Sequence, residues 1–270
     1  MAEATATLAL YRRLIGAQLR SQLQYRISFA LDLGSMFLVS FLDFVAVLVI
    51  FHNVPLLAGW DVGEVAFLYA MSSLSFSIAD LAVGQLDGFA ELIRSGNFDL
   101  MLARPVGTLF QVIAADFALR RVGATLQGFV VLAYALTLVD IDWTPLRPGL
   151  LLVTIASGAT IFAAIWVFVI CITFWAVESK EFTTAFTYGG HYLTQFPLDV
   201  YSIWMRRFLC YFLPLAFVCY LPALYILDRP TALGLPDALR FAAAPVAIIA
   251  ALAARTMWSI SVRHYRSAGG

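Results

Sequence analysis

Long apolar runs separated by short polar connections dominate the pattern of this chain. A bilayer core about 30 Å thick needs about 20 apolar residues in a helix that rises about 1.5 Å per residue. Five runs have this length and few charges, and the stretch between the fourth and the last of them contains a sixth crossing. The predicted spans are residues 29–51, 65–84, 107–139, 148–177, 182–200 and 241–262. The pattern therefore predicts an all-α integral membrane protein with six transmembrane helices in one domain, residues 1–270.

The segment before the first span is amphipathic rather than uniformly apolar. Over residues 6–26 the apolar side chains recur every three or four positions, while arginine and glutamine face the other way. This pattern is typical of an interfacial helix that lies on the membrane surface. A cytoplasmic extension of the first span is the alternative.

Two placements of the fifth crossing are compatible with the sequence. A helix over residues 208–227 leaves Arg206 and Arg207 inside and divides the basic residues 14 inside against 3 outside, which the positive-inside tendency favours. However, the two prolines within it would each remove a backbone hydrogen bond. A helix over residues 182–200 gives 12 against 5. We expect the crossing at 182–200, followed by an outer re-entrant helical hairpin at 202–227, which is tolerated at membrane depth when it faces protein or water.

The arginines also predict the orientation of the chain. They are frequent before the first span, in the second connection and after the last span, whereas residues 52–64 and 140–147 are acidic and contain one arginine. Basic connections stay in the cytoplasm. With six crossings, both termini are expected to be cytoplasmic.

Composition excludes several classes of function. The chain is 62% hydrophobic and only 13% charged, and its 17 basic and 17 acidic residues leave no basic excess for a nucleic acid. The three cysteines lie in apolar stretches without paired spacing, so no metal site is predicted. The single lysine, Lys180, lies outside any glycine-rich loop, so the chain has no P-loop. We expect no cofactor in this chain and no catalytic residues.

The connection after the second span carries a short amphipathic segment, residues 87–99. Asp87 is placed to cap a helix that presents apolar side chains on one side and Glu91 and Arg94 on the other. Gly96 and Asn97 are expected to end this helix in a left-handed turn. The segment is either a docking helix for a cytoplasmic partner or a helix resting on lipid headgroups.

Two groups of motifs carry a resemblance to a known family. The first is Ile93-Arg94-Ser95-Gly96-Asn97-Phe98-Asp99 with Leu102 and Arg104-Pro105-Val106; the second is Phe196-Pro197-Leu198-Asp199, Trp204, Leu213-Pro214-Leu215-Ala216-Phe217 and Tyr220-Leu221-Pro222-Ala223-Leu224. Both resemble the permeases of type-two ATP-binding-cassette (ABC) exporters, and the chain length most resembles their short paired-permease subfamily. The resemblance extends over essentially the whole chain in the order and spacing of the spans.

The resemblance implies a half-channel in the bacterial plasma membrane that pairs with a second permease, identical or different. Two separate cytoplasmic ATPase subunits would bind ATP and magnesium. The cargo would be a hydrophobic or cationic small molecule, such as a drug, an antibiotic or a lipid-like compound. The segment 87–99 would be the coupling helix, with the ATPase contacts Phe89, Glu91, Leu92, Ile93, Arg94, Asn97, Phe98 and Asp99. The residues that mark the outer re-entrant hairpin are Pro197, Trp204, Pro214 and Pro222.

Two acidic residues lie within predicted spans, Asp43 in the first and Asp80 near the cytoplasmic end of the second. A charge at mid-bilayer costs about 2.5–3.5 kcal/mol on insertion scales, so it faces a partner or water. Either these carboxylates bond between helices and to nearby arginines, or they line the export path. A secondary transporter and a membrane-embedded lipid-modifying enzyme are the alternative functions. The first should show internal repeats and the second a convergent catalytic set, and neither feature is visible.

Overall fold

The structure is a computed structural model of the 270-residue chain. It describes residue 24 and residues 26–115, 118–176, 180–230 and 235–265. The regular secondary structure of these ranges is helical, which confirms the all-α class. The interfacial helix expected over residues 6–26 lies almost entirely outside the described residues, as do both termini.

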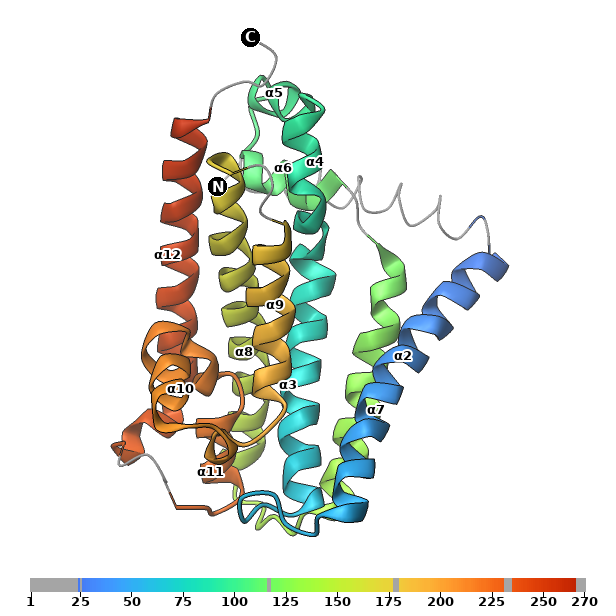
Figure 1. Ribbon diagram of the computed structural model, residues 1–270, viewed down its shortest axis with the longest axis vertical. Coiled ribbons are helices and arrows are strands. Elements are labelled where there is room, and N and C mark those ends of the chain that lie inside the picture. The colour runs from blue at the N-terminus through green and yellow to red at the C-terminus, as the bar shows by residue number, and fades with distance from the viewer. Residues whose placement is uncertain (1–23, 25, 116–117, 177–179, 231–234, 266–270) are drawn as a thin grey trace.

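Five helices in the described part of the chain are long and apolar enough to cross a membrane, counting the short helical turns that continue three of them. They are α2 (Arg26–Asn53), α3 (Val62–Val83), α7 (Val122–Leu138), α8 (Leu146–Ile170) and α12 (Ala243–His264). They run roughly along one direction, with α3 and α8 in the middle (Figure 1).

Short helices connect α3 to α7. They are η1 (Gly84–Gly88), α4 (Phe89–Arg94), α5 (Asn97–Leu102), α6 (Thr108–Ala115) and η2 (Leu119–Arg121). The expected third span, 107–139, is interrupted, because Ala118, just before η2, has an extended backbone. The part of it that is long and apolar enough to cross a membrane is Leu119–Leu138. The apolar side chains Val112 and Ala114 are buried within the chain itself. An apolar run in the sequence does not distinguish this burial from burial in lipid.

The region between α8 and α12 contains the remaining elements. They are η3 (Cys171–Phe174), α9 (Lys180–Thr194), η4 (Leu198–Val200), α10 (Ile203–Arg207), η5 (Phe208–Phe212), η6 (Pro214–Phe217), α11 (Tyr220–Ile226) and η7 (Asp237–Phe241). The helical segments 203–212 and 214–226 meet at an angle of 75°, which fits either a broken span or a re-entrant loop. Helix α9 lies beside α3 and α8, and α10 and α11 lie at the end of the bundle opposite α4 and α5 (Figure 1). The position of the fifth crossing stays a prediction.

Helix α3 forms the centre of the bundle. Every residue from Val65 to Ser77 is buried, because α2, α7, α8 and α9 all contact this helix. Helix α2, in contrast, buries only Phe44 and Val47, and it packs mainly on α7. A Cβ on Gly123 of α7 would lie 2.3 Å from the carbonyl oxygen of Leu33, so glycine permits this close approach. The α2–α7 pair diverges from the rest of the bundle toward the α4 end (Figure 1).

Candidate functional site

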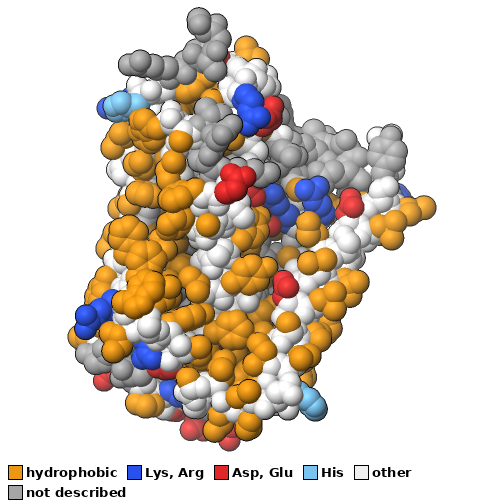
Figure 2. Space-filling view, viewed as in Figure 1, with side chains coloured by type: hydrophobic (Ala, Val, Ile, Leu, Met, Phe, Trp, Pro, Cys, Tyr) orange, Lys and Arg blue, Asp and Glu red, His pale blue; other side chains and the backbone are white. Residues whose placement is uncertain are grey.

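A cavity of about 440 Å³ lies where the α2–α7 pair diverges from α3 and α9. Its lining is mixed, with aromatic, hydroxyl and charged side chains from these four helices and from η1 and η2. The lining residues are Met36, Ser40, Asp43, Tyr69, Ser73, Phe76, Ser77, Asp80, Asp87, Arg120, Arg121, Ala124, Gln127, Tyr188, His191 and Tyr192. Figure 2 shows acidic and basic side chains gathered in this hollow, between apolar surfaces on either side. The cavity is thus a polar space inside a membrane-spanning bundle.

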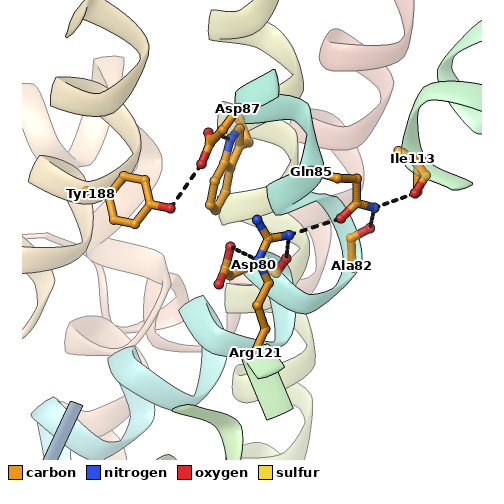
Figure 3. Close-up of polar contacts among 8 residues, drawn as sticks. Asp80, Ala82, Gln85, Asp87, Ile113, Arg121 and Tyr188 are labelled. Atoms are coloured by element: carbon orange, nitrogen blue, oxygen red, sulfur yellow. Dashed lines mark hydrogen bonds and ion pairs between the residues drawn. The ribbon is translucent and has the colours of Figure 1, made fainter. Parts of the chain in front are cut away.

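An ion pair crosses from α3 to the start of α7 at one end of the cavity (Figure 3). Nε of Arg121 lies 3.3 Å from Oδ1 of Asp80, and Nη1 donates to the Asp80 carbonyl and to Oε1 of Gln85, both at 3.2 Å. Gln85 in turn donates to the carbonyl of Ala82 at 2.8 Å and to that of Ile113, in α6, at 2.6 Å. Asp80 therefore has the arginine partner expected of a buried carboxylate, and it also lines the cavity.

Gly84 provides the space for this ion pair. A Cβ at this position would lie 2.0 Å from Oδ1 of Asp80 and 2.7 Å from Nη1 of Arg121. The backbone of Gly84 is right-handed helical and its N–H donates to the Asp80 carbonyl, so the glycine meets a packing requirement and no unusual conformation. The sequence analysis missed this residue.

Asp87 links three segments at the same end of the bundle. Its Oδ1 accepts from Nε1 of Trp166 in α8 at 2.9 Å, and its Oδ2 accepts from the Tyr188 hydroxyl in α9 at 3.1 Å (Figure 3). The expectation that Asp87 caps the next helix is wrong, because the N-cap of α4 is Gly88 and no side chain bonds there. The carboxylate is instead engaged by the aromatic donors, so it fixes η1 against α8 and α9.

The segment 87–99 forms two helices, α4 and α5, joined by Gly96 in the expected left-handed conformation (φ 71°). The expectation that its apolar face is presented to a partner is wrong. Phe89, Ile93 and Phe98 are buried in their own chain. The ring of Phe89 lies 5.1 Å from that of Phe174 and 5.3 Å from that of Trp258. This aromatic contact joins the connection between α3 and α7 to η3 and α12, so the apolar face is already occupied.

The opposite face of α4 and α5 is exposed. Among the expected ATPase contacts, Glu91, Arg94 and Asn97 are exposed, and Leu92 and Asp99 are partly buried. Leu100, which the sequence analysis did not select, is 63% exposed. The surface available to a partner is therefore largely polar, with one large apolar side chain.

Asp43 lies on the α2 side of the cavity, facing an aromatic wall. Within the described residues, its carboxylate has no hydrogen-bond or ion-pair partner. The wall includes His191 of α9, whose ring stacks on Phe76 with centroids 4.2 Å apart. Nε2 of His191 lies 3.0 Å from the side-chain nitrogen of Gln195, and Nδ1 lies 3.4 Å from Oγ of Ser72. The cavity thus combines an unpaired carboxylate with stacked rings.

At the other end of the bundle, four side chains from separate segments form what we call the outer polar cluster, after the side on which the sequence analysis expects it: Trp60, Asp199, Arg206 and Tyr220. Oδ2 of Asp199 accepts from Nε1 of Trp60 at 2.8 Å and from the Tyr220 hydroxyl at 2.9 Å. Nη1 of Arg206 lies 3.7 Å from Oδ1 of Asp199, and Nη2 donates to the Asp199 carbonyl at 2.6 Å. The guanidinium of Arg229 covers the Trp60 ring at 4.3 Å.

The residues expected to mark the hairpin lie around this cluster. Pro197 precedes η4, Trp204 lies in α10 and is 66% exposed, Pro214 begins η6 and Pro222 is buried in α11. In the described ranges, no three His, Cys, Asp or Glu side chains come together as metal ligands do.

Comparison with known proteins identifies the family of this chain. A profile described as "ABC-2 family transporter protein" matches residues 37–269, which include all the long helices except the first turns of α2. No curated protein and no solved structure matches the chain. The chain therefore belongs to the ABC-2 transporter family, as a multi-pass membrane permease of a transport system.

Proposed function

We propose that this chain is the permease subunit of an ATP-driven exporter in the bacterial plasma membrane. It works with a second permease and with two separate ATPase subunits, which bind the ATP and magnesium. The family match supports a transport role, and the only lysine lies in Glu178-Ser179-Lys180-Glu181, outside any phosphate-binding loop. In this proposal, the energy comes from ATP hydrolysis by another chain.

The cavity is the observation that carries this proposal. Ionisable groups at membrane depth are costly unless they face water or a partner, and they mark substrate paths in transport proteins. Three carboxylates, Asp43, Asp80 and Asp87, line the cavity with two arginines and several aromatic rings. A hydrophobic cation satisfies both halves of this lining, because carboxylates attract the charge and aromatic faces accept both apolar and cationic groups. We assign Asp43 to the path, since its carboxylate faces the cavity without a partner among the described residues.

The ATPase docks, in this proposal, on the exposed face of α4 and α5. Glu91, Arg94, Asn97 and Leu100 form that face, and the buried side chains beneath it make the two short helices part of the bundle. A displacement of this face reaches Asp87, which is bonded to Tyr188 in the cavity wall. Nucleotide-driven movement of the ATPases thereby alters the cavity.

The contacts of α9 support a fifth crossing at residues 182–200. Tyr188 bonds to Asp87, just beyond the cytoplasmic end of α3, whereas Asp199 bonds to Trp60, just before the outer end of α3. Helix α9, 15 residues long, lies beside part of α3 between these two contacts. Residues 202–227 then form a re-entrant hairpin on the outer side.

Co-purification tests the proposed function. The chain, tagged and isolated in mild detergent from cells that express its chromosomal neighbours, should bring with it an ABC ATPase and a second permease, if that permease is not a second copy. The complex should hydrolyse ATP, and the isolated chain should not. ATP turnover by the isolated chain, or its isolation in active form without any ATPase, would contradict the proposal.

A further inference from the structure

The outer polar cluster holds three separate segments together through one carboxylate. Trp60 belongs to the turn before α3, Arg206 to α10 and Tyr220 to α11, and all three bond or pair with Asp199. Trp60 and Tyr220 are 1% and 2% exposed, so both donors are buried. A buried donor without an acceptor is costly, and bonds to a charged acceptor are stronger than neutral ones. The segments therefore separate only when the Asp199 carboxylate gives up its donors.

The cavity ends before it reaches this cluster. The outermost cavity residue of α3 is Tyr69, and the next four α3 residues toward the outer end, Val65 to Leu68, are fully buried. Asp199 follows the end of α9 by five residues. Helix α9 itself supplies His191 and Tyr192 to the cavity wall. In this structure, the outer polar cluster thus lies between the cavity and the outer surface.

The outer end of α9 is bonded both to α3 and to the hairpin segment 202–227 and its flank. Oγ1 of Thr194 lies 2.6 Å from Oγ of Ser72 in α3, and the Thr194 carbonyl accepts from Sγ of Cys219 at 3.2 Å. The Tyr201 hydroxyl donates to the Leu193 carbonyl at 3.1 Å. Thr194 and Leu193 thus join the end of α9 to the hairpin, and Thr194 also joins it to α3. The contact that joins the hairpin segment to the turn before α3 is the bond between Asp199 and Trp60.

We propose that Asp199 is a positioning residue that holds the outer end of the cavity closed. Outward opening parts its carboxylate from Trp60, and the hairpin then moves away from the turn before α3. This inference rests on the sidedness given under the proposed function, with the hairpin outside.

A single cavity cysteine reads out the closure without any need for a transported compound. Ser73 lines the cavity and is replaced by cysteine in a chain whose three native cysteines are changed to serine, and the complete complex is kept in intact cells or in inside-out vesicles. In this parent, a membrane-impermeant thiol reagent should label Ser73→Cys from the inside and not from the outside. Adding Asp199→Asn should raise labelling from the outside about tenfold or more, since it weakens bonds to a charged acceptor and places an amide N–H₂ against Arg206.

A milder pair of variants controls for folding. Tyr220→Phe removes one donor to Asp199 and keeps the buried ring, so it should raise outside labelling by a smaller factor. Tyr225→Phe, on the same helix, removes a hydroxyl that has no hydrogen bond within the described residues and should leave labelling unchanged. Unchanged outside labelling in both Asp199→Asn and Tyr220→Phe would overturn the role of Asp199 in closure and would leave the proposed transport function untouched. Labelling of the parent from the outside only would overturn the sidedness, and with it the inference.

Discussion

Gly84→Ala perturbs the Asp80–Arg121 pair without touching either charged residue. The new methyl carbon would lie 2.0 Å from Oδ1 of Asp80 and 2.7 Å from Nη1 of Arg121, so both side chains have to move apart. Overpacking of a core costs about 1–3 kcal/mol, and the steric part here falls at the low end, because the contacted atoms are the ends of side chains that can turn away. The two side chains are only 14% and 17% exposed, so weakening their pairing adds to that cost more than at a surface. Alanine would otherwise be favoured over glycine in a helical backbone, by up to about 1 kcal/mol.

The net expectation is a loss of roughly 1–3 kcal/mol, which corresponds to a lower midpoint by about 2–4 °C per kcal/mol if the scaling of 150–250-residue domains applies. Thermal unfolding in detergent, followed by loss of monodisperse protein, measures it. Gly88→Ala is the matched control. Gly88 lies in the same short helix, η1, and a Cβ at this position would have no neighbouring atom within 4 Å. Asp80→Ala and Gly84→Ala disrupt one pair, so their effects should fall short of additivity. Equal midpoints for the Gly84 and Gly88 variants would refute the reasoning.

Three further expectations concern docking, transport and topology. Ile93→Asp should reduce accumulation of the folded chain, because it buries a charge. Arg94→Glu, on the exposed face, should lower co-purification of the ATPase and leave chain levels unchanged. The reverse pattern would restore the buried face as the docking surface. Asp43→Asn should alter resistance or efflux more than it alters membrane abundance, as immunoblotting compares, and parallel losses would indicate a structural role. Ser202→Cys, exposed at the start of α10, should react with impermeant reagent added to intact cells, and labelling only after the membrane is opened would place the fifth crossing at residues 208–227.

The long helices could be predicted from sequence because bilayer thickness dictates the length of an apolar span. The same criterion failed for residues 107–139, where the first part of the run is apolar because α6 packs on its own chain. The sequence analysis also expected Phe89 and Ile93 to contact an ATPase, whereas both are buried in their own chain. An amphipathic pattern shows that a face is buried, and it does not identify the chain that buries it.

The polar contacts of the site were harder to predict than the spans. Asp80 was singled out because a charge in a span demands a partner, and a nearby arginine was one of the two expectations for it. Asp87 was assigned to a local cap, whereas its donors Trp166 and Tyr188 lie 79 and 101 residues away in the sequence. No local pattern encodes such a contact, and the same holds for Trp60 and Asp199, which are 139 residues apart.

The burial of Phe89 and Phe98 against Phe174 and Trp258 means that two kinds of selection act on the connection between α3 and α7. Substitutions beneath the surface change how the chain folds, whereas substitutions at Glu91, Arg94, Asn97 or Leu100 change only what the surface presents. On the docking face that we propose, a permease of this design can acquire a different ATPase partner, or lose an inappropriate one, through a few exposed positions while its membrane bundle stays as it is. Related transport systems in one cell could keep their subunits apart in this way, by varying the charges on a face a few residues wide.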